Sequence, residues 1–417
     1  MSNHKNEDLN NLTQKVAKKI IENVVTGSPP EYGFQFYTVG LDPYIDTIEE
    51  EYFKTFIREG GAAFKMVVEY YGGGKTHFLY CLRERAWKYN FIASYIPLSP
   101  QETPFHQLDR IYQAIVKNLI FSQSPDELFK GENRGIGAVI KKWYFEKFQE
   151  FSQKVPKDSV LIELKHYIST LKDYDSTSFK NAIKEAFLSL AERSDENFSL
   201  IMQWLKGDPI YKNMVKKFNI FEKIDKSTAF KMIRSLNQWI QDINYTGIIV
   251  LMDEAEITSS MSSKQKDLLL NNLRILIDEC ARVHFKNIMW FYAVPDENFL
   301  EGSTQIYTAL QQRVQTIFNA EINPAGVKIY LEKVIKDPIE TLKQIGEKLA
   351  LIFEKAQKIQ FNKTELIKTI QNFAVDSYEN RFVSGVKRYF VQKIIPAFRQ
   401  LDITGNAVLP DEIQNGS

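Results

Sequence analysis

The chain has 417 residues, 44% of them hydrophobic, and its 53 lysines and arginines nearly cancel its 52 aspartates and glutamates. This balance argues against a histone-like nucleic-acid binder, so any contact with DNA must be local. The longest apolar runs are strand-sized, well short of the roughly 20 residues of a membrane helix. The polar N-terminal segment lacks the core of a secretory signal, and two cysteines and five histidines suggest neither a disulfide framework nor a transition-metal site. We expect a globular cytoplasmic protein without membrane contact.

Helical and strand-like segments alternate along the chain. A helix is predicted over residues 11–25, a short extended segment over 34–40 and another helix over 42–57. Strands are predicted at 62–70, 91–98, 247–252, 287–294 and 315–322. Strands that alternate with helices indicate an α/β domain with a mostly parallel sheet.

Two long helical regions accompany the predicted sheet. The segment between the second and third strands is too long for a simple crossover, so we expect a helical insertion beside the sheet. The helical pattern after residue 324 predicts a C-terminal helical lid. The predicted units are an N-terminal and adenine-side segment (1–60), a P-loop core (61–98 and 247–323), the insertion (99–246), the lid (324–403) and a flexible tail (404–417).

Three glycines end the first predicted strand and precede a lysine and a threonine. Only glycine lets successive backbone N–H groups turn into one concavity and approach phosphate oxygens closely. Lysine then reaches the phosphates, threonine offers a hydroxyl to Mg²⁺, and the following helix directs its N-terminus at the anion. The residues predicted to bind nucleotide here are Gly72, Gly73, Gly74, Lys75, Thr76 and His77.

The phosphate motif is imperfect at its first position. The usual spacing of a glycine, four residues and then Gly-Lys-Ser/Thr would place that glycine at position 69, where this chain has Glu69. Either this carboxylate points away from the phosphates, toward a basic neighbour, or it repels them and weakens ATP binding. The sequence alone leaves both outcomes open.

A second motif supports the first. Residues 247–252 form an apolar strand pattern that ends in Asp253 and Glu254, as in a Walker B motif. Asp253 at the strand end can hold Mg²⁺ through water, together with Thr76. Glu254 can orient and deprotonate the water that attacks the γ-phosphate.

Further residues fit roles in an oligomeric ATPase. A polar sensor is expected after the fourth strand, but that strand ends in Val294, so Asp296 or Asn298 could serve instead. Arg313 lies where an arginine finger would reach the ATP of a neighbouring subunit, and a surface arginine is an equal alternative. Arg388 follows Gly385 in a GxxR pattern typical of a lid sensor, with a solvent-exposed arginine as its alternative.

These motifs resemble the ATP-binding proteins of BREX phage-defence systems, a branch of the AAA+ ATPases related in layout to origin-recognition ATPases. The resemblance rests on AKKIIENVVTGSPP, FYTVGLDPYI, the stretch from VVEYYGGGKTHFLY to IASYIPLS, IIVLMDEAE, and FYAVPDENF with ALQQR. It implies an AAA+ base with a helical lid, ATP and Mg²⁺ as ligands, and ATP-dependent assembly. It also implies that Val39 and Gly40 line the adenine pocket and that Arg388 is the lid sensor. Such proteins usually have glycine where Glu69 stands and a small hydroxyl residue where Val294 stands, so the hydrolysis rate is the inherited property least supported.

The leading hypothesis is therefore an ATP-hydrolysing AAA+ motor or switch in phage defence, which assembles with itself and with other defence proteins. DNA remains an open partner. A second hypothesis is a nucleotide-binding scaffold with weak hydrolysis, suggested by Glu69 and Val294. A third is a DNA-loading ATPase of the origin-recognition or transposition type, although little chain follows Arg388 to form a DNA-binding module.

Overall fold

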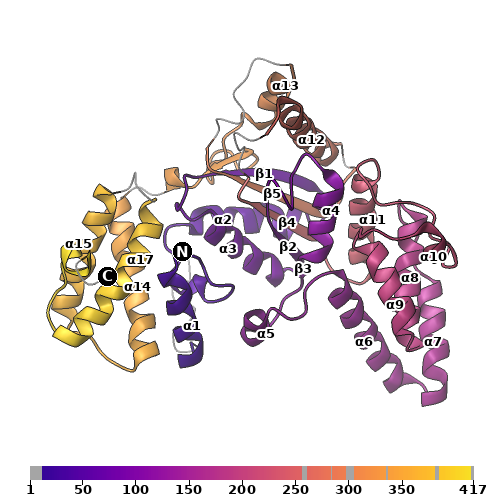
Figure 1. The fold of residues 1–417 in the computed structure, drawn as a ribbon, viewed down its shortest axis with the longest axis horizontal. Coiled ribbons are helices and arrows are strands. Elements are labelled where there is room, and N and C mark those ends of the chain that lie inside the picture. Colours follow the sequence, from indigo (N-terminus) through magenta and orange to yellow (C-terminus); the bar gives the residue numbers. More distant parts are fainter. Residues whose placement is uncertain are drawn as a thin grey trace.

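One central sheet organises the molecule. The computed structural model describes residues 12–255, 261–282, 284–296, 305–334, 337–380 and 385–414. Within these ranges the sheet has six strands in the order β3-β2-β4-β5-β1-β6, and all neighbours are parallel except β2 and β3 (Figure 1). The strands are β1 (Ala62–Val68), β2 (Ile92–Pro97), β3 (Leu119–Ile120), β4 (Ile248–Asp253), β5 (Ile288–Val294) and β6 (Lys328–Tyr330). The predicted mostly parallel α/β fold is confirmed.

The central strands are buried on both faces, as expected for parallel strands covered by helices. Every residue of β4 and β5 is buried. Side chains alternate between the faces of a strand, and accordingly Val250 belongs to one apolar core whereas its neighbour Leu251 belongs to the other. The register aligns the carboxyl ends of the strands, because Val68 pairs with Val294 and Pro97 pairs with Asp253.

Helices from both ends of the chain share one of these cores. It contains residues of the N-terminal segment, of the helix after β1 and of the C-terminal helices. Its elements are α1 (Gln14–Val25), η2 (Phe34–Tyr37), α2 (Asp42–Ile48), η3 (Glu49–Phe56), α3 (Lys75–Lys88), α14 (Pro338–Gln357), α15 (Lys363–Glu379) and α17 (Val386–Thr404). Helix α1 packs against α14 and α17 (Figure 1).

The other core lies between the opposite face of the sheet and the inserted helices. Figure 1 shows helices α6 to α9 as a group that extends away from the sheet on the side opposite the C-terminal helices. The elements of the insertion are α4 (Leu108–Lys117), α5 (Pro125–Lys130), α6 (Ile136–Lys154), α7 (Lys157–Ser169), α8 (Thr177–Ala191), α9 (Asp195–Leu205), α10 (Lys212–Lys216) and α11 (Ala229–Asp242). After β4 the chain adds α12 (Ser263–Ala281), and after β5 it adds α13 (Gln305–Val314).

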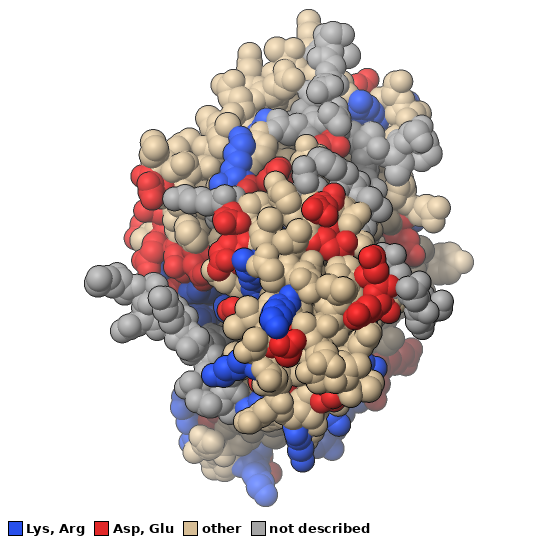
Figure 2. Space-filling view, turned by 90° about the vertical axis from the view of Figure 1, so that its left-hand side faces the viewer, with Lys and Arg blue, Asp and Glu red and all other residues tan. Residues whose placement is uncertain are grey.

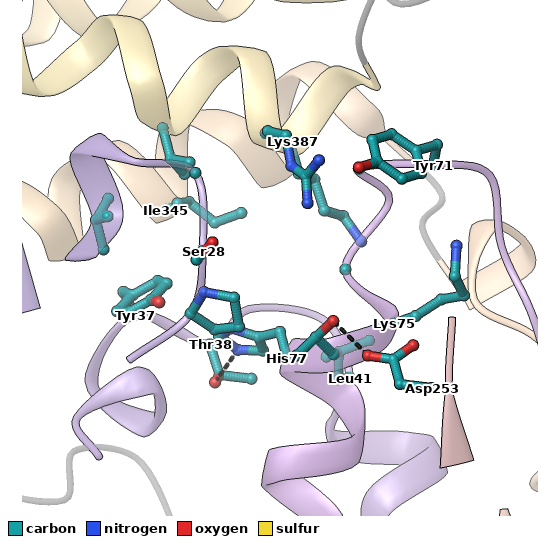
Figure 3. Close-up of a pocket in the computed structure, with 18 of the residues that line it drawn as sticks. Ser28, Tyr37, Thr38, Leu41, Tyr71, Lys75, His77, Asp253, Ile345 and Lys387 are labelled. Atoms are coloured by element: carbon teal, nitrogen blue, oxygen red, sulfur yellow. Dashed lines mark hydrogen bonds between the residues drawn. The ribbon is translucent and has the colours of Figure 1, made fainter. Parts of the chain in front are cut away.

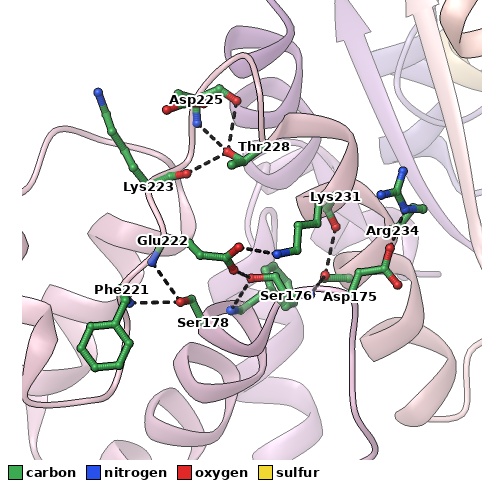
Figure 4. A network of polar contacts seen from close by, with 12 residues as sticks. Asp175, Ser176, Ser178, Phe221, Glu222, Lys223, Asp225, Thr228, Lys231 and Arg234 are labelled. Atoms are coloured by element: carbon green, nitrogen blue, oxygen red, sulfur yellow. Dashed lines mark hydrogen bonds and ion pairs between the residues drawn. The ribbon is translucent and has the colours of Figure 1, made fainter.

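A polar network holds the inserted helices together near their junction with the sheet layer (Figure 4). The backbone N–H of buried Ser176 donates to Ser235 Oγ at 2.8 Å, and Ser176 Oγ donates to Glu222. Arg234 binds Asp175 Oδ2 at 2.5 Å and Glu279 Oε2 of α12 at 2.9 Å. The insertion is therefore anchored to α12 by an ion pair as well as by apolar packing.

Two local predictions are wrong. Residues 34–37 form a 3₁₀ helix rather than an extended segment, because Gly33 turns the chain with φ +97° and directs Phe34 into the core. Residues 315–322 do not form a strand. Asn319 Oδ1 instead accepts from the N–H groups of Glu321 and Ile322, which makes a turn, and the sixth strand follows at 328–330.

Lys65 of β1 secures this turn from beneath. Its side chain is 1% exposed, and its Nζ donates to Gly326 O at 2.6 Å, Pro324 O at 2.9 Å and Tyr52 Oη at 2.6 Å. Burial lowers the pKa of Lys65 to about 7. Among the described residues Lys65 has no carboxylate partner, and its ammonium group instead satisfies buried backbone carbonyls.

The C-terminal helices form a compact layer at one end of the molecule. Within the segment expected to be a flexible tail, Val408 is buried and its N–H donates to Thr369 Oγ1 at 3.0 Å, and α18 (Pro410–Gln414) follows. Figure 2 shows acidic side chains through the middle of this face and basic ones toward its lower end. None of the described helices combines the length and apolarity that crossing a membrane requires.

Candidate functional site

A cleft lies at the carboxyl end of β1 and β4, between the sheet and the C-terminal helices (Figure 3). It encloses about 1030 Å³ with its open mouth included. Segments that are distant in sequence contribute to its wall. The lining residues are Val24, Gly27, Ser28, Pro29, Tyr37, Thr38, Val39, Leu41, Tyr71, Gly72, Gly74, Lys75, Thr76, His77, Asp253, Glu254, Pro295, Ile345, Lys387, Arg388 and Val391.

The glycine loop turns where β1 ends and α3 begins. Gly72 and Gly74 have φ of +75° and +105°, in the left-handed region that favours glycine. Helix α3 starts at Lys75, so its first N–H groups and its dipole face the loop. Lys75 Nζ donates to Glu69 O at 2.6 Å and to Tyr70 O at 3.2 Å. This geometry offers an anion both backbone N–H groups and an ammonium group.

Asp253 and Thr76 meet at the floor of the cleft. Thr76 Oγ1 donates to Asp253 Oδ2 at 2.5 Å, and Tyr95 Oη donates to the same oxygen at 2.9 Å. Asp253 is only 1% exposed. Hard divalent cations such as Mg²⁺ bind a hydroxyl and a carboxylate, often together with water and phosphate oxygens. The pair therefore fits the predicted magnesium site, although no larger cluster of His, Cys, Asp and Glu gathers among the described residues.

Glu254 is held in an unusual backbone conformation beside Asp253. Its φ of +57° is uncommon for a residue with a side chain, and its N–H donates to Asp253 Oδ1 at 2.9 Å. The side chain is exposed and lines the cleft. Strained backbone of this kind is often found where it positions a functional side chain.

Glu69 lies beneath the glycine loop and does not line the cleft. It is 8% exposed, and a Cβ placed on Gly73 would stand 2.2 Å from Glu69 Cγ. Its Oε1 accepts from the N–H of Tyr70 at 3.1 Å. Burial raises the pKa of Glu69 to about 7, against the opposing charge of Lys387. Of the two alternatives left open by the sequence, the carboxylate pointing away from the cleft is the one observed.

The opposite wall of the cleft is apolar and aromatic around a neutral histidine. His77 Nε2 lies 2.6 Å from Thr38 Oγ1, and its ring packs edge-on against Phe34 and Tyr37. Burial lowers the pKa of His77 to about 3, helped by the charges of Lys387 and Lys348. An apolar wall with one oriented polar group is suited to a flat heterocycle.

Helix α17 brings two cations to the glycine loop. Lys387 Nζ donates to Gly73 O at 2.8 Å, and the backbone N–H of Arg388 donates to Gly72 O at 3.3 Å. The guanidinium of Arg388 lies 4.5 Å from the ring centroid of Tyr71. Both side chains line the cleft.

Other predicted residues lie in varied places. Val39 lines the cleft, whereas Gly40 is not part of the lining. Val294 is fully buried and Pro295 takes its place at the cleft wall, while Asn298 is outside the described residues. Arg313 does not line the cleft and forms a two-point ion pair with Asp278, at 2.6 and 3.1 Å.

Sequence reasoning missed Tyr95, Thr38 and Lys387. Tyr95 lies in an ordinary strand pattern, and Thr38 gives no signal apart from its closeness to Val39. Lys387 is adjacent to Arg388 in GVKR, and only the docking of α17 distinguishes the two.

A mostly parallel α/β sheet with a glycine loop at a strand end, opening into a helix, defines a class of proteins that bind the phosphates of nucleotides. Within that class the chain belongs to the family of BREX system ATP-binding proteins BrxC/D, whose model matches residues 12–414. No curated protein and no solved structure gave a significant match.

Proposed function

We propose that this protein is an AAA+ type ATPase that acts as a motor or switch in a cytoplasmic phage-defence system of the BREX type. The observation that carries the proposal is the meeting of Thr76 and Asp253 at 2.5 Å, directly below the glycine loop and beside Glu254. Family membership supports ATP as the ligand. The C-terminal helices form the lid in this proposal, because residues of α17 line the same cleft.

Each group has a distinct role in this proposal. The N–H groups of the glycine loop and Lys75 bind the phosphates, and the wall of Thr38, Val39 and His77 accepts the adenine. Thr76 and Asp253 would hold Mg²⁺, which neutralises phosphate charge when bound. Glu254 orients the attacking water and accepts its proton.

Two substitutions test hydrolysis against mere binding. Lys75→Ala removes a phosphate contact and should abolish ATP binding and turnover, whereas Glu254→Gln should bind ATP and lower turnover by at least about a hundredfold. Binding is measured by calorimetry and turnover by phosphate release, with Glu59→Gln as a surface control. If Glu254→Gln hydrolyses ATP as fast as the unaltered protein, Glu254 is not the catalytic base.

A second candidate function is a nucleotide-binding scaffold that hydrolyses ATP slowly. Val294 is fully buried where a polar sensor would face the γ-phosphate. Val294, the last residue of β5, therefore offers no polar side chain at this position. Tight ATP binding without measurable phosphate release by the unaltered protein would favour the scaffold over the motor.

Assembly and partners are also proposed. Arg313 would serve as a finger toward the ATP of a neighbouring copy, and it must leave Asp278 to do so. The Glu254→Gln variant, held in its ATP-bound form, should therefore show the largest oligomer by light scattering. Other defence-system proteins are expected partners on family grounds. DNA contact would fall away from the face in Figure 2, where acidic side chains occupy the middle.

A further inference from the structure

The start of helix α17 lies so close to the glycine loop that a side chain at Gly385 would clash with the loop backbone. A Cβ placed on Gly385, just before α17, would stand 2.0 Å from Tyr71 O and 2.8 Å from Gly72 Cα. Gly385 also has φ of +77°. Only glycine lets the start of this helix touch the loop backbone, so the contact is a built feature of the fold.

The docked helix places the side chain of Lys387 in the phosphate region itself. In Figure 3 this side chain extends from α17 down toward the glycine loop. Its Nζ donates to Gly73 O at 2.8 Å and lies 3.6 Å from where a Cβ on Gly74 would stand. Lys387 lines the same cleft as Gly72, Gly74 and Lys75 of the loop.

The neighbouring Arg388 is less well placed for the same task. Its guanidinium lies over the ring of Tyr71, and its Cγ is 2.9 Å from where a Cβ on Gly27 would stand. Arg388 is thus packed between the rim of the loop and the segment after α1. Successive residues of a helix point about 100° apart, so only one of the two can face the loop directly.

Glu69 explains why a second ammonium is needed. This buried carboxyl lies against Gly73, and Lys387 is the strongest opposing charge acting on it. Without Lys387, any negative charge on Glu69 would weaken the attraction of the loop for phosphate. The positive charge of Lys387 thus offsets, at the loop, the negative charge of Glu69, which stands where the usual motif has glycine.

We propose that Lys387 is a phosphate-binding residue supplied by α17, whose ammonium exchanges Gly73 O for a phosphate oxygen when a nucleoside polyphosphate binds. The bound nucleotide then joins α17 to the glycine loop. This inference rests on the proposed ATP-binding function and adds to it the residue that couples nucleotide to the C-terminal helices.

The test compares ligands with and without phosphates. Lys387→Met should weaken binding of a non-hydrolysable ATP analogue by roughly ten- to hundredfold, the loss expected for one charge-assisted contact, and leave the affinity for adenosine unchanged. Lys387→Arg should restore most of the affinity. The matched control is Lys393→Met, which removes a lysine from the same helix outside the cleft.

The outcomes separate this inference from the proposed function. If Lys75→Ala loses the analogue but Lys387→Met binds it as tightly as the unaltered protein, Lys387 is not a phosphate ligand although the ATP site is real. Equal losses for adenosine and the analogue would show a structural role and also overturn the inference. Failure of the unaltered protein to bind ATP would overturn both.

A measurement on the unaltered protein removes dependence on variant folding. Hydrogen exchange of residues 386–390 should slow when the analogue is added and should not respond to adenosine. If the exchange rate of residues 386–390 is the same with and without the analogue, the phosphates do not contact α17.

Discussion

Replacing Glu69 by glutamine tests the electrostatics beneath the glycine loop. The amide oxygen of glutamine can still accept the N–H of Tyr70, and the side chain keeps the volume that packs against Gly73. Only the titrating charge is removed. The charged groups that act on this position are Lys387, Lys75 and Glu332.

The magnitude follows from the raised pKa. A carboxyl group with pKa of about 7 in the folded chain and 4.5 in the unfolded chain destabilises the fold by about 3 kcal/mol above pH 7. Below pH 4.5 both states hold the proton and the group contributes nothing. As the pH rises through this window, the unfolded chain releases its proton first, so the free energy of unfolding falls.

The assay is urea unfolding followed by tryptophan fluorescence at pH 5 and pH 8. The stability of Glu69→Gln relative to the unaltered protein should rise by about 2 to 3 kcal/mol between these pH values. Glu59→Gln, a substitution at an exposed glutamate, should show no such trend. An advantage of Glu69→Gln that is the same at both pH values would refute the raised pKa and with it the burial of charge under the loop.

Two further predictions concern the walls of the cleft. Because the pKa of His77 is depressed from 6.5 to about 3, the unfolded chain binds a proton at this residue before the folded chain does, and the free energy of unfolding falls as the pH drops below 6.5. His77→Gln removes this effect, so the variant should lose about 1 to 2 kcal/mol less stability than the unaltered protein between pH 7 and pH 5, measured by urea unfolding. An unchanged pH profile would contradict a neutral His77. Gly385→Ala should push α17 away from Tyr71 O and weaken ATP binding at least about tenfold in calorimetry. The far-ultraviolet circular dichroism spectrum should not change. Wild-type affinity for ATP would show that the close approach is dispensable.

Much of the site could be predicted because its groups are encoded locally. The glycine loop and the Asp253-Glu254 pair each follow an apolar strand, and parallel strands bring their carboxyl ends to one edge. Distance in sequence does not obscure such a pattern. The same logic failed at residues 315–322, where apolar residues suggested a strand but the side chain of Asn319 hydrogen-bonds to the following backbone.

The placement of Lys387 at the glycine loop and the orientation of Glu69 could not be predicted, because both depend on tertiary docking. The sequence shows that Glu69 replaces the usual glycine, but it does not show whether the carboxylate points into the cleft or lies beneath the loop. Likewise, GVKR offers two adjacent cations, and the approach of α17 through Gly385 decides which one faces the loop. No local pattern encodes that approach.

The packing of α1 on α14 and α17 has a consequence for biosynthesis. Gln14 Nε2 donates to Ala356 O at 2.9 Å, and Gln392 Nε2 donates to Thr26 O at 3.2 Å. Helix α1 and the residue after it are therefore hydrogen-bonded to α14 and α17, which are made much later in synthesis. A chain emerging from the ribosome can fold its sheet before α17 exists, but the cleft still lacks one wall. Nascent chains should therefore remain unable to hold nucleotide tightly until α17 has been synthesised.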